Sequence, residues 1–172
     1  MIRIANEKDI NRIAEIYEHI HNAEELGEAV IGWKRNVYPT YQTALEGISK
    51  EDMFVEENES TIVAAGRINR EQVKEYADCP WLYQASDSEV MVLHTLVVDP
   101  QIKGKGYGSE FVKFYEAYAA SQKCHYLRMD TQEKNISARK FYMKFGFREA
   151  GIVFCTFNEI PEVRLVCLEK KI

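Results

Sequence analysis

The chain has 172 residues, of which 46% are hydrophobic and 28% charged, and this length and balance favour one globular domain over two. Its longest apolar runs are far shorter than the ~20 residues that cross a bilayer, so no membrane segment is expected. The net charge of −5 disfavours a general nucleic-acid-binding protein, because such proteins carry a basic surface.

The charge is divided unevenly along the chain. Residues 1–100 carry 9 basic and 19 acidic side chains, whereas residues 101–172 carry 13 basic and 8 acidic side chains. Chance scatter over solvated surfaces explains such a pattern. A protein whose second half meets a polyanion and whose first half meets a cation explains it equally well, and both interpretations stay open.

The absence of a secretion signal and of metal-binding motifs indicates which compartment and metal content to expect. The N-terminal residues contain no apolar stretch of the kind found in secretion signals, so a cytoplasmic protein is expected. The four cysteines are far apart and form no C-x-x-C pair, and His19 and His21 point to different sides of a predicted helix. Reduced thiols and no metal site are therefore expected.

The first half of the chain is expected to begin with a strand and two helices. Ile10, Ile13, Tyr17 and Ile20 recur at spacings of three, four and three residues, which is typical of one apolar helix face. The polar insertion 70–88 is assigned to neither helix nor strand. The elements expected before it are a strand at residues 2–4, helices at 8–21 and 40–50, and paired strands at 53–56 and 61–69.

The second half is expected to open on a central strand. Residues 89–99 are rich in Val and Leu, with apolar side chains on both alternating faces, which is typical of a strand covered on both sides. Gly146 fits the left-handed residue that ends a helix. The other elements expected are a helix from about residue 106, a strand at 126–130, a helix at 135–145, and two antiparallel strands at 152–158 and 162–169.

A glycine-rich loop, QIKGKGYGS at residues 101–109, joins the central strand to the next helix. Glycines let a backbone approach a ligand closely and turn its N–H groups toward one point. The first N–H groups of a helix lack intrahelical partners and carry partial positive charge, which favours anions. Lys103 and Lys105 add full charges, so the loop predicts a phosphate-binding site.

Two common nucleotide-binding motifs do not match the loop. A Walker P-loop needs Ser or Thr after the Gly-Lys pair, but Gly106 follows Gly104 and Lys105. A dinucleotide fingerprint needs the spacing G-x-G-x-x-G, but Gly108 is only two residues beyond Gly106. A plain glycine-rich connection without a ligand remains an alternative.

Two motifs in the second half resemble the GCN5-related N-acetyltransferase (GNAT) family. The family signature is Gln or Arg, two residues, Gly, one residue, and Gly or Ala, which Gln101, Gly104 and Gly106 match. A second motif is similar to the family pattern at Asn135, Ala138, Phe141, Tyr142, Gly146 and Phe147. The resemblance is specific over residues 89–150 and is not diagnostic in the first 50 residues or in the insertion 70–88.

The resemblance implies an α+β fold in a single domain of residues 1–172. The expected architecture is a central, mostly antiparallel twisted sheet with one splayed parallel strand pair and helices on both faces. Residues 1–50 would supply acceptor-side helices, and residues 89–150 would form the core that binds acetyl-CoA. The implied activity is transfer of an acetyl group from acetyl-CoA, as cosubstrate, to a primary amine by direct attack on the thioester.

The resemblance also implies the roles of individual residues. Backbone groups of Leu96 and Val98 would bind the pantetheine arm, and a backbone N–H near Leu96 or Val97 would polarise the thioester carbonyl. Loop N–H groups would hold the pyrophosphate. Asn135 would contact the pantetheine, and its alternative role is a helix N-cap. The residues implied to bind acetyl-CoA are Leu96, Val97, Val98, Gln101, Lys103, Gly104, Lys105, Gly106, Tyr107, Gly108, Ser109, Asn135, Ala138 and Tyr142.

Catalysis requires an amine that has lost a proton, because an alkyl ammonium has a pKa of about 10.4. Glu89 and His94 on the central strand are the candidate general bases. Whether they share a face depends on where a bulge falls, because one inserted residue reverses the alternation. By resemblance, Tyr142 faces the departing sulfur as general acid; its alternative role is packing.

Two other functions fit the same motifs: a non-catalytic acyl-CoA-binding regulatory module on the same fold, and an interaction domain whose glycine loop is only structural. Within the enzyme interpretation, the acceptor is a small-molecule or peptide amine. The acidic first half favours a cationic one. A homodimer is the default expectation for the assembly.

Overall fold

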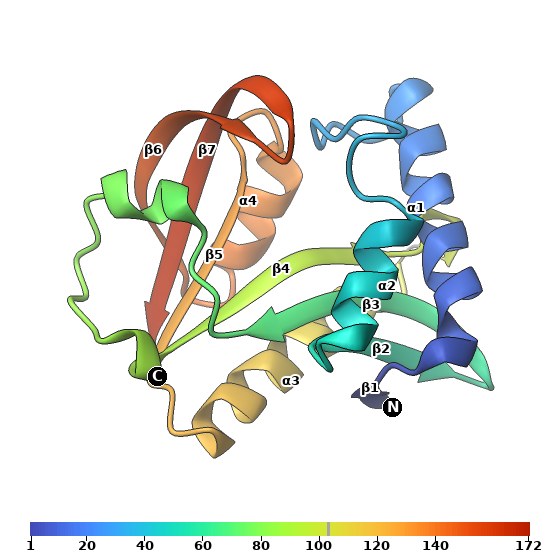
Figure 1. Cartoon of the computed structure of the whole chain (residues 1–172), viewed down its shortest axis with the longest axis horizontal. Helices are drawn as coiled ribbons and strands as arrows, with labels where there is room; N and C mark the ends of the chain where they lie inside the picture. The colour runs from blue at the N-terminus through green and yellow to red at the C-terminus, as the bar shows by residue number, and fades with distance from the viewer. Residues whose placement is uncertain (103) are drawn as a thin grey trace.

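Seven strands form one mixed sheet in a computed structural model that describes residues 1–102 and 104–172 (Figure 1). The strand order is β1-β2-β3-β4-β5-β7-β6. Among the described strands, β4 and β5 pair in parallel and every other neighbouring pair is antiparallel. The strands are β1 (Ile2–Ile4), β2 (Met53–Asn58), β3 (Thr61–Asn69), β4 (Val90–Val98), β5 (Tyr126–Gln132), β6 (Arg148–Phe157) and β7 (Ile160–Lys171).

Helices cover both faces of this sheet. α1 (Ile10–Glu25) and α2 (Tyr41–Ser49) pack on one face, where Ile13 and Ile16 meet Met53 and Val55 of β2. α3 (Tyr107–Ser121) and α4 (Ile136–Met143) pack on the other face. Four short 3-10 helices are the other elements of the described residues: η1 (Glu7–Asp9), η2 (Lys74–Asp78), η3 (Asp87–Glu89) and η4 (Pro100–Ile102).

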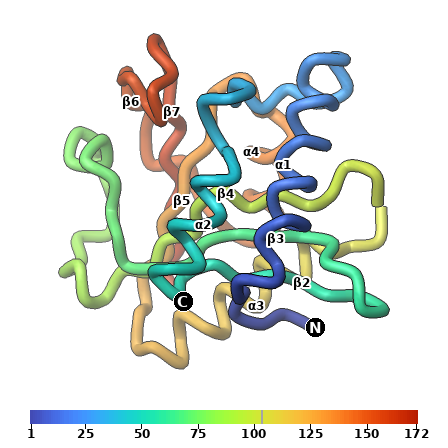
Figure 2. The backbone as a smooth tube through the Cα atoms, turned by 45° about the vertical axis from the view of Figure 1, so that its right-hand side comes forward, coloured from blue at the N-terminus to red at the C-terminus, as the bar shows by residue number. Residues whose placement is uncertain are grey.

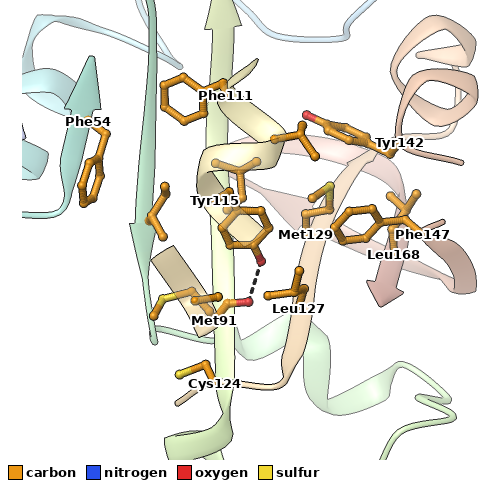
Figure 3. Packing of buried hydrophobic residues seen from close by; sticks show 14 of the residues in the cluster. Phe54, Met91, Phe111, Tyr115, Cys124, Leu127, Met129, Tyr142, Phe147 and Leu168 are labelled. Atoms are coloured by element: carbon orange, nitrogen blue, oxygen red, sulfur yellow. Dashed lines mark hydrogen bonds between the residues drawn. The ribbon is translucent and has the colours of Figure 1, made fainter. Parts of the chain in front are cut away.

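Tyr115 of α3 holds the parallel strand pair together at its paired end. This tyrosine is fully buried, and its hydroxyl group donates to the carbonyl of Met91 in β4 at 2.7 Å (Figure 3). The same hydroxyl group also donates to the carbonyl of Arg128 in β5 at 3.1 Å. The same hydroxyl group therefore bridges the two strands close to where they begin to separate.

Beyond that point the two parallel strands diverge, as Figure 1 shows. The pairing of β4 with β5 ends at Leu93, opposite Met129. On the other side of β4, His94 is opposite Arg67, but Val97 is opposite Ala65, so β4 contains one extra residue there. Thr95 lies in this bulge with a left-handed backbone (φ 53°), a conformation that a β-branched residue rarely adopts. The bulge turns β4 away from β5.

The expected fold class is confirmed: a mostly antiparallel sheet, one splayed parallel pair, and helices on both faces. The elements predicted from the sequence are present, with shifted ends; β6, for example, begins at Arg148, four residues before the expected start at 152. The unassigned insertion 70–88 contains η2 and packs on the β5–β7 end of the sheet. Every helix within the described residues is too short or too polar to span a membrane.

Candidate active site

A cavity of about 680 Å³ opens on the face that carries α1 and α2. Five separate parts of the chain form its walls: the segment from Ile31 to Glu46, the end of β3 with the start of the insertion, part of β4, part of β5, and the β6–β7 hairpin. In the backbone view of Figure 2, the β6–β7 hairpin, α2 and α1 follow one another from left to right. The walls are therefore assembled from segments that are far apart in sequence.

A second cavity, of about 130 Å³, occupies the gap where β4 and β5 diverge. Its lining includes Leu96, Val97 and Val98 of β4 and residues of α4. Among the described residues, the edge of β4 beyond Leu93 has no strand partner on its β5 side, so that edge offers backbone groups to a ligand. Six residues line both cavities, which therefore meet at the bulge: Ile31, Trp33, Leu93, Thr95, Asp130 and Thr131.

The glycine loop leads from β4 to the N-terminus of α3. Gly104 and Gly106 have left-handed backbones (φ 86° and 84°), and a Cβ at either position would meet no described atom within 4 Å. Gly106 is the N-cap of α3, so the first N–H groups of the helix face open space beside it. Lys105 is exposed, and the predicted contact of Lys103 lies outside the described residues. The geometry suits an anion-binding site.

Other loop residues have structural roles that the sequence did not indicate. Tyr107, the first residue of α3, has a buried side chain. A Cβ at Gly108 would lie 3.3 Å from the Phe141 ring, so glycine lets α3 approach α4 closely. Ser109 N–H already donates to the Gly106 carbonyl at 2.9 Å, which removes it from the predicted set of phosphate donors.

Asp99 anchors the loop to α1. Its buried carboxylate accepts hydrogen bonds from Arg12, from His19 and from the N–H of Gln101, the last at 2.9 Å. Burial alone would raise the pKa of Asp99, but the bonds from Gln101, Arg12 and His19 outweigh it and lower that pKa. The start of the loop is thus held by contacts of Asp99 with residues of α1 that lie 80 or more positions earlier in the sequence.

Asn135 and Ala138 both line the smaller cavity. The Asn135 side chain accepts a hydrogen bond from the Ala138 N–H at 3.1 Å, so its alternative role as the N-cap of α4 is confirmed. The cap uses the oxygen of the amide and leaves its nitrogen able to donate to a ligand. The contact with a ligand stays a prediction.

Tyr142 contributes its side chain to the smaller cavity from the α4 face of the sheet. Its ring contacts Phe141 and Phe147, and Figure 3 shows the hydroxyl group pointing away from Phe147. Burial, and then the charge of Asp130, raise the pKa of Tyr142 well above its ordinary value. The hydroxyl group therefore stays protonated at neutral pH and can act as a donor.

Asp130 lies at the junction of the two cavities, and its sequence context did not single it out. Burial raises the pKa of this carboxyl group to about 6, although a hydrogen bond from Tyr76, with the Tyr76 Oη 2.8 Å from its Oδ2, opposes the rise. The available signal was its position at the carboxyl end of a parallel strand, where α/β sheets place their ligand sites.

The larger cavity carries negative charge. Arg67 in its wall is neutralised by Asp52, with Arg67 Nε 2.8 Å from Asp52 Oδ1. No basic side chain within the described residues pairs with Glu46, Asp130 or Glu159, all of which line the cavity. A cation would be favoured there.

A comparison with known families finds a match over most of the chain. The model of the acetyltransferase (GNAT) family matches residues 10–147, which is more than half of the chain. The chain belongs to this acetyltransferase family.

Relatives and solved structures agree with this membership. The streptothricin acetyltransferase of Escherichia coli is 31% identical over 83 residues, 48% of this chain and 44% of that protein. The chain spans less than half the length of the curated relatives it matches. A GNAT acetyltransferase of Streptococcus agalactiae has the same fold, with 20% identity, a TM-score of 0.81, and coverage of 100% of this chain and 95% of that one. The Salmonella typhimurium protein yncA, solved with acetyl-CoA as its cofactor, has 16% identity and a TM-score of 0.69 over 99% of this chain and 92% of that one.

His94 is one of the two general bases predicted from the sequence, and it does line the larger cavity. Burial, followed by the nearby Arg67 charge, lowers the pKa of His94 to about 4. One ring nitrogen, Nε2, is 3.0 Å from Asn69 Oδ1 and is occupied by that contact. With its pKa this low, the imidazole is a weak proton acceptor at pH 7, even though the Asn69 contact leaves Nδ1 free.

Glu89, the other predicted base, is brought to neither cavity. It lies in η3, before β4 begins, and its Oε2 accepts from the N–H and the hydroxyl group of Ser86, the latter at 2.6 Å. These hydrogen bonds lower the pKa of Glu89. The bulge falls after His94, so it does not bring the two residues onto one face. The prediction that Glu89 is a general base is therefore wrong, because its carboxylate caps a turn instead.

Proposed function

We propose that this protein transfers an acetyl group from acetyl-CoA to a primary amine by direct attack on the thioester. The observation that carries the proposal is the meeting of two cavities at the bulge of β4. One cavity lies in the gap between β4 and β5, and the other is acidic. A thioester and an amine entering from opposite sides of the sheet would meet at Thr95.

The smaller cavity suits the pantetheine arm of acetyl-CoA, which supplies the activated acetyl group. Backbone groups of Leu96 and Val98 would pair with the arm as an added strand, because that edge of β4 has no partner on its β5 side among the described residues. A backbone N–H near Leu96 or Val97 would polarise the carbonyl. The N–H groups from Gly104 to Gly108, together with Lys105, would hold the pyrophosphate.

The test is release of free thiol from acetyl-CoA in the presence of a panel of primary amines. Amine-dependent thiol release, with the acetylated amine found by mass spectrometry, is the expected result. Binding of acetyl-CoA without release by any amine would instead indicate a regulatory module. Absence of binding in calorimetry would leave only an interaction domain.

We also propose that the acceptor is a cationic amine with a second positive charge. The support is the set of carboxylates in the larger cavity, Glu46, Asp130 and Glu159, which no described basic side chain neutralises. A carboxylate-lined cavity raises the local concentration of cations, and added salt weakens this attraction.

Glu46→Gln and Glu159→Gln should each lower kcat/KM for diamines about three- to ten-fold and leave kcat/KM for neutral-chain monoamines nearly unchanged, since only the second charge is affected. Steady-state kinetics at two ionic strengths check this. Glu28→Gln is the matched control, because Glu28 is exposed outside the cavity. The idea fails when neutral or acidic amines are the best acceptors, or when diamine turnover ignores salt.

A further inference from the structure

Asp130 holds a position that no other ionisable residue of the described chain shares. Of the six residues that line both cavities, it alone can accept a proton near neutral pH; the others are apolar, aromatic or hydroxyl side chains. It comes from the face of β5 that looks into the acidic cavity, whereas Tyr142 reaches the same gap from the α4 side. The amine and the thioester carbonyl would meet between these two side chains.

Tyr76 holds the Asp130 carboxylate in one orientation. The Tyr76 hydroxyl group donates to Oδ2 at 2.8 Å, so Oδ1 remains for the cavity. Tyr76 is 3% exposed and its ring packs edge-on against Trp81, with the ring centroids 5.1 Å apart. Both residues belong to the insertion 70–88, which thereby supports a side chain 54 residues further along the chain.

We infer that Asp130 is the general base of the acetyl transfer and that Tyr76, from the insertion 70–88, is its positioning residue. This inference rests on the proposed function. It gives the base role to neither of the residues predicted from the sequence, because Glu89 lies outside both cavities and burial beside Arg67 makes His94 a weak base.

Protons and electrons balance across the step. The amine nitrogen uses its lone pair to form a bond to the thioester carbonyl carbon, and an N–H of the now positive nitrogen becomes strongly acidic. Asp130 Oδ1 accepts that proton, the C–S bond breaks, and the thiolate leaves with the bonding electron pair toward the Tyr142 hydroxyl group. Amide and coenzyme A thiolate are the products, and Asp130 then returns its proton to solvent. No oxidant or further reactant is needed.

The surroundings of Asp130 set the pH at which it can act. The groups whose charge or hydrogen bond bears on it are Glu75 and Tyr76 of η2, Tyr38, Tyr142 of α4, Cys155 of β6 and Cys167 of β7. None of these is a cation, and burial raises the pKa of Asp130 to about 6. Below that pH the carboxyl group is protonated and accepts no proton, so turnover falls as pH falls; above it, the base is present.

The test compares Asp130→Asn, Tyr76→Phe and His94→Gln, with putrescine or the best amine of the panel as acceptor. Asp130→Asn should lower kcat about 100-fold and remove the inflection near pH 6. Tyr76→Phe should lower kcat less and move the inflection to higher pH, because the lost hydrogen bond had lowered the pKa of Asp130. His94→Gln should change kcat less than ten-fold and leave the inflection in place.

A second measurement does not depend on turnover. Carbon-13 NMR titration of the Asp130 carboxyl carbon should show a pKa near 6 in the wild-type protein and a higher value in Tyr76→Phe. Stabilisation by acetyl-CoA should persist in every variant and identifies the folded ones. Should Asp130→Asn not fold, the shifts of the NMR pKa and of the kinetic inflection in Tyr76→Phe test the assignment of Asp130.

The outcomes separate the two proposals. An active wild-type protein whose Asp130→Asn variant keeps its kcat and its pH profile overturns the assignment of Asp130 alone. The same holds when Tyr76→Phe leaves both the NMR pKa and the inflection unmoved, or when His94→Gln removes the inflection. A wild-type protein that binds acetyl-CoA but transfers acetyl to no amine overturns the proposed function and this inference with it.

Discussion

Replacing Tyr142 by phenylalanine should lower the turnover of acetyl transfer by about 10²–10⁴-fold with little change in acetyl-CoA affinity. The substitution keeps the ring that packs against Phe141 and Phe147 and removes only the hydroxyl group in the smaller cavity. The departing thiolate belongs to a thiol with a pKa of about 8.5. Because the pKa of Tyr142 is raised, its hydroxyl group remains a donor over the whole assay range and stabilises the thiolate.

Single-turnover and steady-state kinetics at saturating acetyl-CoA measure this effect, and calorimetry measures the affinity. Tyr118→Phe is the control, because Tyr118 of α3 packs against Phe54 and Phe114 and lines neither cavity. A Tyr142→Phe protein that retains most of its activity from neutral to alkaline pH would remove the hydroxyl group from the mechanism and leave packing as its role.

Replacing Gly106 by valine should abolish the stabilisation of the fold by acetyl-CoA. A ligand at 100 times its dissociation constant stabilises a protein by about 2.7 kcal/mol, and this shift should disappear. The added side chain would stand in the open space at the start of α3, where the phosphates are expected. The left-handed backbone of Gly106 adds a cost of about 1–2 kcal/mol that is independent of the ligand.

Gly27→Val separates the two effects. Gly27 follows α1, has a left-handed backbone (φ 74°) and also has open space at its Cβ position, but it is not part of the glycine loop. Denaturant unfolding should show similar losses of stability for both variants without ligand, and an acetyl-CoA shift only in Gly27→Val. An undiminished shift in Gly106→Val would place the phosphates elsewhere.

The sequence by itself determined those features that depend on neighbouring residues. The glycine loop was visible because left-handed positions and a helix start need particular residues at fixed local spacings, as Gly104 and Gly106 confirm. The Asn135 cap was visible for the same reason. The helix and strand periods identified the elements, and the two motifs identified the family and therefore the fold class.

Only the tertiary structure decided which side chains share a cavity. The bulge at Thr95 depends on the pairing of β4 with β3, which no local pattern of β4 encodes. The charge halves of the sequence do not by themselves give the charge of the cavity, because Glu46 comes from the acidic half and Asp130 and Glu159 from the basic half. Charge in a cavity depends on which residues fold into its wall.

The protonation behaviour of the candidate bases was equally beyond the sequence. Glu89 and His94 are residue types that can act as a base. In the structure, Ser86 binds the Glu89 carboxylate, and burial next to Arg67 lowers the pKa of His94. Asp130 became a candidate through burial and through Tyr76, a contact between residues 54 positions apart. The free energy of desolvating a charge, and the hydrogen bond that offsets it, exist only once distant segments have packed together.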